Sequence, residues 1–271
     1  MTDQLSLFGS PAPPAPQPHP KGSLIYEPKG RAREYAALAC NIYKGCDHRC
    51  IYCYAPSATH KSASDFAASS TRNDFLAKLE KEARKFSGVT GRILLCFTCD
   101  PYQHLDVRSG HTREAIRILK RHGFDVEVLT KGGRRALRDL DLFTAADAFA
   151  TTLTLLDDDT SLEWEPNAAP PSDRIATIQE FHAAGIPTWV SLEPVLDPEV
   201  ALEIIHQTCG FVDLYKVGKL NYHRRANEIN WQRFVHDAIR ALDDLGYVRN
   251  TDHDTLQAGQ FFIKHDLAAY L

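Results

Sequence analysis

Six short apolar runs alternate with amphipathic stretches along most of this chain, and this alternation constrains its fold more than any other feature. The runs are rich in β-branched and aromatic residues and have the length of strands; they cover residues 36–43, 92–98, 124–130, 148–155, 186–192 and 212–217. The other stretches have the pattern of helices and cover residues 73–86, 111–122, 134–146, 172–184, 198–207 and 225–245. Six strand–helix units in succession predict an α/β fold with a parallel sheet. A closed barrel of this kind needs eight units, so six units favour an open or partial barrel.

The 271 residues divide into three predicted parts. Residues 1–23 include "GSPAPPAPQPHPKGS", which is too rich in proline and small residues to bury a core, and they are predicted to form a disordered tail. Residues 24–246 hold the six units and are predicted to form the barrel. Residues 247–271 are predicted to pack on the barrel as an extension, with "QFFIKHDL" as a last strand at the edge of the sheet.

Charge and cysteine content indicate the compartment. The net charge is −4, no apolar run approaches the roughly 18 residues of a membrane span, and the N-terminus has no signal-peptide pattern. These features predict a cytoplasmic protein without a membrane partner, in which thiols stay reduced. The chain has seven cysteines, an odd number, and three of them lie in one short loop, so we expect no disulfide framework.

Polar residues follow the apolar runs at the points where the predicted strands end. Parallel α/β folds carry their functional sites at the carboxyl ends of strands, so these side chains are candidates for one site. Turn formation explains any one of them equally well. A cysteine loop that follows the first run favours the functional interpretation, because it opens onto the same rim. The polar residues are Thr98, Cys99 and Asp100; Thr130 and Lys131; Thr152 and Thr154; Ser191 and Glu193; and residues 216–221.

Cys46, Cys50 and Cys53 fall within eight residues, "CDHRCIYC". Structural zinc is bound by four Cys or His ligands, and His48 or His60 is available to complete such a site. An iron–sulfur cluster that is held by only three thiolates instead leaves one iron open to a ligand that is not protein. The number of thiols alone leaves both kinds of centre open.

The spacing Cys-x3-Cys-x2-Cys, with Tyr52 directly before the third cysteine, resembles the signature of the radical S-adenosylmethionine superfamily. The resemblance implies a [4Fe–4S] cluster on Cys46, Cys50 and Cys53, whose fourth iron chelates the amino and carboxylate groups of S-adenosylmethionine. It also implies that one electron from an external reductant, such as flavodoxin or ferredoxin, cleaves this cofactor to methionine and a 5′-deoxyadenosyl radical, which abstracts a hydrogen atom from a substrate. The superfamily fold is a partial (β/α)6 barrel, in agreement with the six units.

Further stretches resemble one branch of this superfamily. "NIYKGCDHRCIYCYAP", "TCDPYQ" and "LTKGG" are similar to spore photoproduct lyase and its relatives, often called DNA repair photolyases, and the similarity extends over residues 30–221. The resemblance implies that Tyr52 and Tyr54 take part in passing a radical back to the cofactor and that Tyr52 lies against the adenine. Ordinary packing beside the cluster would explain either tyrosine as well.

The same resemblance assigns further residues to S-adenosylmethionine. The "TCDP" stretch takes the place of the motif that binds the amino group of the cofactor, and a lysine on the third strand end is the predicted partner of the carboxylate. One of two threonines on the fourth strand reaches the ribose, and a glutamate after the fifth strand either anchors the barrel or touches the ligand. These cofactor-binding candidates are Thr98, Cys99, Asp100, Lys131, Thr152, Thr154 and Glu193.

The chain departs from the lyase at the hydrogen donor. In the lyase, a cysteine directly before the threonine of this strand end donates a hydrogen atom to the substrate radical, whereas here that position is Phe97 and Cys96 and Cys99 flank it. Strand alternation places Cys96 and Phe97 on opposite faces, so Cys96 is predicted to point away from the site and Cys99 is the predicted donor. This departure leaves thymine-dimer reversal itself open. Cys40 and Cys209 are interpreted as small buried apolar residues.

Three kinds of function remain open from the sequence. The branch resemblance favours an enzyme that acts on nucleic acid, and so do basic residues near the strand ends, although solvated helix faces would explain the same charges. The second is a radical enzyme that modifies a protein, a peptide or a small molecule. The third is a non-catalytic, metal-stabilised binding module, which leaves the polar strand ends unexplained. The basic residues are Arg134, Arg135, Arg138, Lys216, Lys219, His223, Arg224 and Arg225.

The segment Gln4–Phe8, "QLSLF", differs from the proline-rich sequence that follows it. It resembles the pentapeptide by which bacterial polymerases and repair proteins dock on the DNA sliding clamp. Leu7 and Phe8 would fill an apolar pocket and Gln4 would make a polar anchor, while the proline-rich spacer gives reach. The resemblance implies the sliding clamp as a partner; folding of this segment back onto the domain is the alternative.

Overall fold

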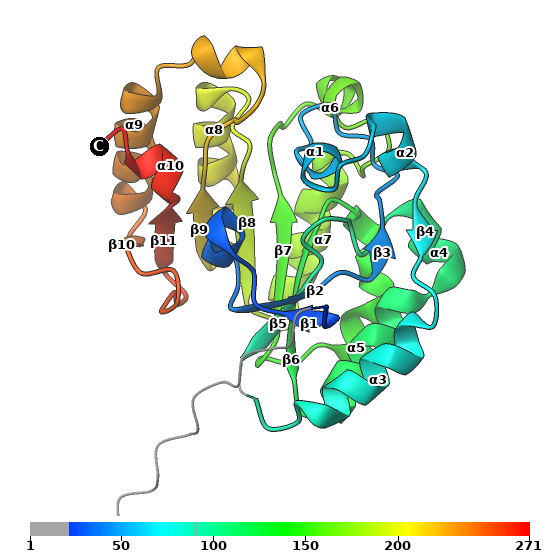
Figure 1. Cartoon of the computed structure of the whole chain (residues 1–271). Helices are drawn as coiled ribbons and strands as arrows, with labels where there is room; N and C mark the ends of the chain where they lie inside the picture. Colours follow the sequence, from blue (N-terminus) through cyan, green and yellow to red (C-terminus); the bar gives the residue numbers. More distant parts are fainter. Residues whose placement is uncertain (1–21, 90) are drawn as a thin grey trace, which may run out of the picture.

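The computed structural model describes residues 22–89 and 91–271. Six parallel strands lie side by side in chain order at its centre (Figure 1), and the helices connect one strand to the next. This arrangement confirms the predicted α/β fold with a partial (β/α)6 barrel. The segment Gln4–Phe8 lies outside the described residues. The six strands are β2 (Leu38–Cys40), β5 (Arg92–Leu95), β6 (Asp125–Thr130), β7 (Ala148–Thr152), β8 (Thr188–Leu192) and β9 (Leu214–Val217).

Three more strands extend this sheet to nine. The short strand β1 (Ile25–Tyr26) pairs antiparallel with β2 at one edge. At the other end, β11 (Gln260–Ile263) pairs parallel with β9, and β10 (Val248–Asn250) pairs parallel with β11. The stretch "QFFIKHDL", which was predicted to form the edge strand, therefore contributes a strand between β9 and β10. The edge of the sheet is formed by β10.

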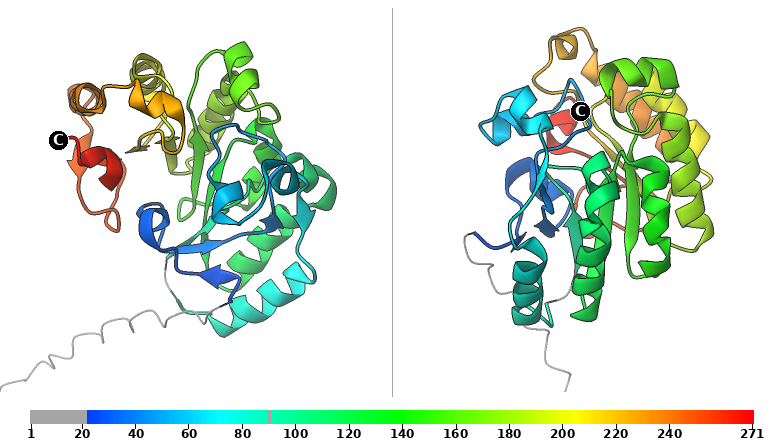
Figure 2. Two further views of the ribbon diagram at one scale, coloured as in Figure 1. Left: turned by 45° about the horizontal axis from the view of Figure 1, so that its top comes forward. Right: turned by 90° about the vertical axis from the view of Figure 1, so that its right-hand side faces the viewer.

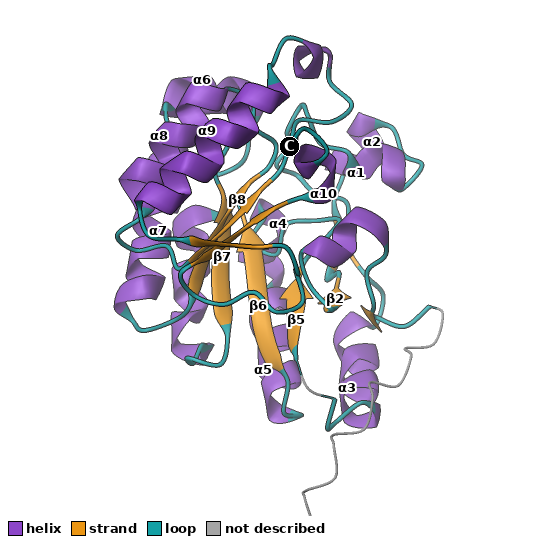
Figure 3. Cartoon of the chain, turned by 90° about the vertical axis from the view of Figure 1, so that its left-hand side faces the viewer, coloured by secondary structure: helices purple, strands orange, loops and turns teal. Residues whose placement is uncertain are grey.

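Five α-helices of eleven or more residues lie on the outer side of the curved sheet, where Figures 2 and 3 show them as one layer. Each buries one face; Leu79 and Ile116, for example, are fully buried against the sheet. Gly123 and Gly185 adopt positive φ angles of 83° and 77° directly after two of these helices, as the helix-stop pattern requires. The helices are α3 (Phe75–Lys85), α5 (His111–Arg121), α7 (Pro171–Ala183), α8 (Pro198–Thr208) and α9 (Trp231–Asp244).

The helix predicted over residues 134–146 is shorter and of a different type. The structure has a 3-10 helix, η2 (Gly133–Leu142), at this position. The guanidinium of Arg113 donates a hydrogen bond to the carbonyl oxygen of Arg138 (2.8 Å). This contact comes from another helix, and local periodicity gives no sign of it.

The helix predicted over residues 225–245 is divided. The 3-10 helix η3 (Arg224–Asn227) comes first, and α9 begins separately at Trp231. The Asn230 side chain accepts a hydrogen bond from the backbone N–H of Arg233 (3.0 Å) and so caps the start of α9. An N-cap inside the predicted helix is therefore the physical reason for the break.

The second strand ends earlier than its apolar run. The run over residues 92–98 predicts a strand throughout, but β5 ends at Leu95. The backbone N–H groups of Phe97 and Thr98 donate to Oδ1 of Asn41 (2.7 and 2.8 Å) instead of to a neighbouring strand. A side chain thus replaces the sheet partner, and the chain bends at residues 97–99.

Several short elements that the periodicity does not predict gather near the carboxyl ends of the strands, as Figure 1 shows for α1, α2 and α6. Their four to seven residues are too few to show a helical period. No helix in the described part of the chain is long and apolar enough to cross a membrane. The short elements are η1 (Gly30–Glu34), α1 (Ala55–Ala58), α2 (Ala63–Ala67), α4 (His104–Ser109), α6 (Asp158–Trp164) and α10 (His265–Ala268), with the hairpin of β3 (Tyr43–Lys44) and β4 (Ser70–Thr71).

Candidate active site

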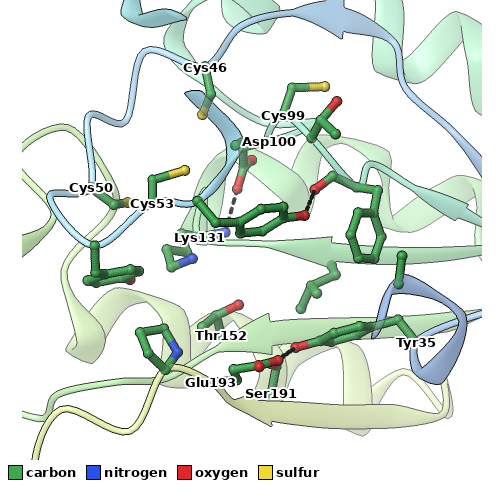
Figure 4. A pocket seen from close by; sticks show the side chains of 18 of the residues that line it. Tyr35, Cys46, Cys50, Cys53, Cys99, Asp100, Lys131, Thr152, Ser191 and Glu193 are labelled. Atoms are coloured by element: carbon green, nitrogen blue, oxygen red, sulfur yellow. Dashed lines mark hydrogen bonds between the residues drawn. The ribbon is translucent and has the colours of Figure 1, made fainter. Parts of the chain in front are cut away.

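A cavity of about 400 Å³ opens at the carboxyl ends of the parallel strands. Its wall is formed by the cysteine loop on one side and by the ends of β5, β6, β7 and β8 on the other, as Figure 4 shows. Most of the predicted site residues meet here, although they are spread over 148 positions of the sequence, from Cys46 to Glu193. The size is typical of pockets that bind a cofactor or small ligand.

The three cysteines of the loop all line this cavity, and none of them is in a disulfide. Gly45 directly before them has a φ angle of 79°, and a Cβ atom at this position would lie 2.2 Å from the carbonyl oxygen of Phe66. The backbone N–H of Cys46 donates to the same oxygen (3.0 Å). Only glycine therefore allows the loop to approach the 66–69 segment this closely.

Side chains and backbone from distant segments fix the rest of the loop. The Asp47 N–H donates to Oε1 of Gln103 (3.0 Å), and the Asp47 carbonyl accepts from Nδ2 of Asn167 (2.7 Å). The Ile51 N–H donates to the carbonyl of Trp164 (3.0 Å). The loop is thus held on both sides, so its three thiols have defined positions.

The thiols fit an iron–sulfur cluster better than a single metal ion. Among the described residues, no three His, Cys, Asp or Glu side chains are placed so that they could bind one metal ion. In a [4Fe–4S] cluster each thiolate binds a different iron, so the sulfur atoms lie further apart. His60 is exposed, and the ring nitrogens of His48 face Asp100 and Arg135, so neither histidine completes a zinc site.

Burial raises the pKa of all three thiols, to about 12 for Cys50. Without a metal centre the cysteines are therefore neutral thiols at pH 7. A positively charged metal centre reverses this preference, because metal ligation favours the thiolate. The donor set suits a group that brings its own positive charge into the cavity.

Asp100 lies at the end of the cavity nearest Cys46 and connects three segments. Its Oδ1 accepts hydrogen bonds from the Tyr102 N–H (2.8 Å) and the Thr130 hydroxyl (2.6 Å), and its Oδ2 accepts from the Lys131 N–H (2.7 Å). Burial would raise the pKa of this carboxyl, but the His48 ring and the three donors outweigh it and lower the pKa overall. The protein itself thus uses both oxygens of Asp100, which the sequence assigns to the cofactor.

Lys131 lines the cavity beside the cysteine loop, where Figure 4 shows it below Cys53. Its Nζ lies 5.6 Å from the centre of the Tyr52 ring. Burial disfavours the charge of this lysine, but Cys50 and Glu165 nearby raise its pKa overall. The side chain is therefore a cation at pH 7, as its predicted role as carboxylate partner requires.

Both tyrosines of the loop line the cavity, with different partners. The Tyr52 hydroxyl donates to Glu165, which is in turn ion-paired with the buried Arg174. The Tyr54 hydroxyl donates to the carbonyl of Phe97 (3.3 Å), and this side chain is half exposed. Burial raises the pKa of both phenols, so both are protonated at pH 7.

Thr152, at the end of β7, and Thr154, in the loop after it, lie in different surroundings. Thr152 lines the cavity, whereas Thr154 is not among the residues of its wall. The Thr154 hydroxyl donates to Oε1 of Glu165 (3.2 Å) and so belongs to the network that holds Tyr52. Of the two alternatives for the ribose, the geometry favours Thr152.

Glu193 and two residues that the sequence did not indicate form one end of the cavity. Glu193 accepts hydrogen bonds from Tyr35 and Lys264, and the Tyr35 hydroxyl also lies 3.1 Å from Oγ of Ser191. All four side chains line the cavity. Lys264 directly follows β11, so the strand-end rule could have found it; Tyr35 lies in no motif, and no signal indicates it.

Cys96 is not where strand alternation places it. Both Cys96 and Cys99 line the cavity, with 4 % and 9 % of their surfaces exposed. The alternation does not apply, because β5 ends at Leu95 and the chain bends after it. Cys40 is fully buried as predicted, whereas Cys209 is only partly buried and its thiol donates to the His206 carbonyl.

Several of the predicted basic residues are ion-paired or buried. Arg134 pairs with Asp173, Arg138 with Asp106 and Arg225 with Asp197. Lys216 is buried, and its Nζ donates to the carbonyl of Tyr35. Lys219 is the one member of the predicted set that lines the cavity, where Lys29 and Arg31 also lie.

The fold, the three-thiol loop and the cavity define an enzyme that works with a cluster-bound cofactor. A model of the Radical SAM superfamily matches residues 40–212, and the chain belongs to this superfamily. Membership in this superfamily implies a [4Fe–4S] cluster and S-adenosylmethionine as cofactors.

Relatives of known sequence extend the match but do not specify the reaction. An uncharacterized protein of Mycobacterium tuberculosis is 30% identical over 167 residues, which cover 58% of this chain and 48% of that protein. An uncharacterized protein of Methanocaldococcus jannaschii is 24% identical over 190 residues, or 69% of this chain and 71% of that protein. This chain spans about half the length of the mycobacterial relatives it matches.

Solved structures share the fold at low identity. A spore photoproduct lyase variant superposes with a TM-score of 0.62 at 12% identity, over 84% of this chain and 76% of that chain. SuiB of Streptococcus suis bound to S-adenosylmethionine gives a TM-score of 0.55 at 13% identity, over 83% and 49%. At these identities the comparison supports the architecture alone.

Proposed function

We propose that this radical S-adenosylmethionine enzyme abstracts a hydrogen atom from a nucleic-acid substrate, in DNA repair or modification of the spore photoproduct lyase type. One observation carries the proposal: the wall of the cavity that holds the three cluster cysteines also contains thiols outside the cluster loop, and Cys99 is the more exposed of the two. A thiol readily donates a hydrogen atom to a carbon radical. The cavity thus combines a site where a substrate radical can form with a group that can quench it.

The cysteines of the loop and several other residues of the wall have separate roles in this proposal. Cys46, Cys50 and Cys53 hold the cluster, and the Lys131 ammonium binds the cofactor carboxylate. The bound cluster and S-adenosylmethionine supply a 5′-deoxyadenosyl radical. Tyr52 provides an apolar face for the adenine, and the hydroxyl of Thr152 reaches the ribose.

Two further residues of the cavity return the radical to the cofactor. Cys99 donates its thiol hydrogen to the substrate radical. Tyr54 is the next donor, because its hydroxyl is protonated at pH 7 and already contacts the Phe97 carbonyl, two residues from Cys99. Thr98 and Asp100 hold the strand end that presents Cys99, since the Thr98 N–H is fixed by Asn41 and the Asp100 carboxylate by three donors.

Two observations support nucleic acid as the substrate. A solved spore photoproduct lyase variant holds AdoMet and a dinucleoside spore photoproduct, and it shares this fold with a TM-score of 0.56 at 15% identity. Lys29, Arg31 and Lys219 line the cavity. The Lys219 ammonium donates to the Tyr270 hydroxyl (2.8 Å), a neutral partner that leaves its charge free to attract a phosphate.

A second candidate is modification of a protein, a peptide or a small molecule. It is favoured by the ion pairs of Arg134, Arg138 and Arg225, which neutralise much of the predicted basic surface, and by the net charge of −4. A nucleic-acid substrate predicts binding that weakens steeply with salt, whereas this alternative does not.

The test combines binding with turnover. Reconstituted protein, kept anaerobic, is titrated with fluorescent single-stranded and duplex DNA at several salt concentrations, and 5′-deoxyadenosine is quantified after addition of dithionite. We expect affinity to fall steeply with salt and DNA to raise the yield of 5′-deoxyadenosine. Lys219→Gln should weaken binding, and Lys81→Gln on the outer helix α3 is the matched control.

Three kinds of outcome would contradict the proposal at different levels. Salt-independent binding, or no effect of DNA on the yield, would favour the peptide or small-molecule candidate. A Cys99→Ala variant should still form 5′-deoxyadenosine but give altered products; an unchanged product pattern would remove Cys99 as the donor. Absence of 5′-deoxyadenosine from wild type, with the Cys53→Ala variant as its blank, would leave only a binding module.

A further inference from the structure

Two thiols outside the cluster loop lie together at the end of β5, in the sequence Cys96-Phe97-Thr98-Cys99. Both line the cavity, and neither is in a disulfide. Burial raises the pKa of the Cys96 thiol, and the neighbouring Cys99 raises it further. Three consecutive bends, at residues 97–99, turn the chain so that side chains three positions apart can meet.

The backbone of this four-residue segment is held by one neighbour. Oδ1 of Asn41 accepts from the N–H groups of both intervening residues, Phe97 and Thr98 (2.7 and 2.8 Å). The next backbone N–H in the same neighbouring segment, that of Ile42, donates to Sγ of Cys96 (3.4 Å). The two sulfur atoms are therefore presented from a fixed bend and not from a free loop.

From this arrangement we propose that Cys96 and Cys99 are a redox-active dithiol that a low-molecular-weight disulfide converts reversibly to an intramolecular disulfide in the cavity wall. The thiolate of Cys99 attacks the external disulfide, forms a mixed disulfide and releases one thiolate. Cys96 then gives its proton to the first released thiolate and attacks Cys99 Sγ, which closes the Cys96–Cys99 bond and releases the second thiolate, to be protonated by solvent. In sum, two protein thiols and one external disulfide give one protein disulfide and two external thiols.

The order of the two attacks follows from exposure. Cys99 is the more accessible thiol, at 9 % against 4 % for Cys96. Burial also raises the pKa of Cys96, which keeps it a thiol until the mixed disulfide has formed beside it. Cys99 is thus the attacking residue and Cys96 the resolving one.

The pair has a consequence for hydrogen transfer by Cys99, and this consequence rests on the proposed function. A disulfide has no S–H bond, so the oxidised enzyme lacks its hydrogen donor while the cluster thiols are unchanged. Reduction by a dithiol would restore the donor. Product formation would then depend on the ratio of thiol to disulfide in the solution around the enzyme.

The experiment measures the disulfide directly. Cluster-loaded enzyme is equilibrated anaerobically in glutathione buffers of increasing oxidised fraction, alkylated with light and heavy iodoacetamide before and after reduction, and analysed by peptide mass spectrometry. We expect Cys96 and Cys99 to lose alkylation together in one two-electron transition, while Cys209 stays reduced. Visible absorbance and iron content are recorded in every buffer.

Variants assign the roles. Cys96→Ser should trap glutathione on Cys99 as a stable mixed disulfide, and Cys209→Ser should leave the transition unchanged. Of the nearby thiols, Cys46 is a cluster ligand in the loaded enzyme, and Cys40 is fully buried and is not part of the wall. A Cys40–Cys96 disulfide, two thiols that remain alkylated in the most oxidising buffer, or a transition that only follows loss of the cluster would each overturn the proposal.

The outcome is separable from the proposed function. The 5′-deoxyadenosine formed from S-adenosylmethionine in reduced samples, with and without DNA, tests the radical reaction without reference to the pair. Failure of the disulfide would leave that reaction standing, and failure of DNA to act as substrate would leave the redox transition measurable.

Discussion

Asp100 illustrates how single buried side chains hold this site together. Its two carboxylate oxygens accept three hydrogen bonds, from the Tyr102 N–H, the Thr130 hydroxyl and the Lys131 N–H. These donors belong to the segment after β5 and to the end of β6, and the His48 ring of the cysteine loop lies 3.5 Å away. The position of this carboxylate therefore decides how the strand ends meet the cluster loop.

The substitution Asp100→Asn should destabilise the protein. An amide has one acceptor oxygen and would turn its N–H₂ group toward at least one backbone donor, so we expect a loss of about 1–3 kcal/mol. Urea unfolding under anaerobic conditions at pH 7, with iron content measured in parallel, checks this. The control is Asp141→Asn, because Asp141 is exposed and pairs with Arg113 at the surface. Equal stability of the two variants would contradict the role given to Asp100.

Lys216 predicts an unusual dependence of stability on pH. Burial, opposed by Glu127 and reinforced by Lys264, lowers the pKa of Lys216 from 10.5 to about 8. Between these two values the unfolded chain binds a proton that the folded chain has released, so the free energy of unfolding rises with pH. Relative to Lys216→Met, wild type should gain roughly 3 kcal/mol between pH 7.5 and pH 10.5.

The measurement is urea unfolding of both proteins at matched pH values. The difference between them cancels the titration of the other groups, cysteines included. Lys81→Met, at an exposed lysine of α3, controls for the loss of a lysine as such. A wild-type stability that falls relative to Lys216→Met as the pH rises would show that the lysine is stabilised in its charged form.

At the scale of elements, the order of the six strand–helix units was predictable because strands and helices differ in the period of their apolar residues. The elements that shape the site were not, because side chains from other segments determine them. Asn41 ends β5 by taking two of its backbone donors, and Asn230 divides a predicted helix by capping α9. Helices of four to seven residues, such as α1 and α6, are too short to carry a period.

The candidate site was predictable to the extent that it lies in motifs. Spacing located the three thiols, and the strand-end rule located Lys131, Thr152 and Ser191. Tyr35 and Lys264 could not be placed beside Glu193 from sequence, because they are 158 and 71 positions away from it. Strand alternation was misleading for Cys96, since the strand had already ended.

The cysteine loop gives a prediction for an element as a whole. Gly45→Ala would place a Cβ 2.2 Å from the Phe66 carbonyl oxygen at a φ angle of 79°, so the loop must move away from the 66–69 segment. Gly88→Ala has a comparable φ angle of 97° but no atom within 4 Å of the new Cβ. We expect Gly88→Ala to cost about 1 kcal/mol and Gly45→Ala clearly more, with lower iron content after reconstitution.

The comparison of the two variants separates strain from contact. Both variants place alanine in the left-handed region of backbone angles. Any additional loss of stability in Gly45→Ala therefore reports the close approach to Phe66. The iron content and the visible absorbance of each reconstituted variant are the deciding measurements. Full cluster content in Gly45→Ala would show that the loop tolerates the displacement.

At the scale of the whole molecule, segments from both ends of the described chain meet at the cavity. Tyr35, just after η1, and Lys264, just after β11, both contact Glu193 at the end of β8. The Lys264 ammonium also lies 3.6 Å from Glu34. The C-terminal segment is thus part of the cavity wall, because β11 pairs with β9 and so brings Lys264 to the ends of the parallel strands.

The last prediction concerns the tail that precedes the barrel. If Gln4–Phe8 is a clamp-binding peptide, the full-length chain should bind purified bacterial sliding clamp with micromolar affinity, about −8 kcal/mol. Leu7 and Phe8 supply the apolar contact, so the double variant Leu7→Ala/Phe8→Ala should abolish binding, whereas Ser6→Ala should preserve it. Isothermal titration calorimetry of the three proteins against the clamp is the measurement.

Such binding would raise the local concentration of the enzyme at replicated DNA without any new contact to the barrel. It would therefore favour nucleic acid over a peptide as the substrate, independently of the salt titration. No heat of binding at high micromolar clamp, or the same affinity in the double variant, would leave residues 1–23 as a spacer without a partner. In that case the substrate question would depend on Lys219 and the cavity alone.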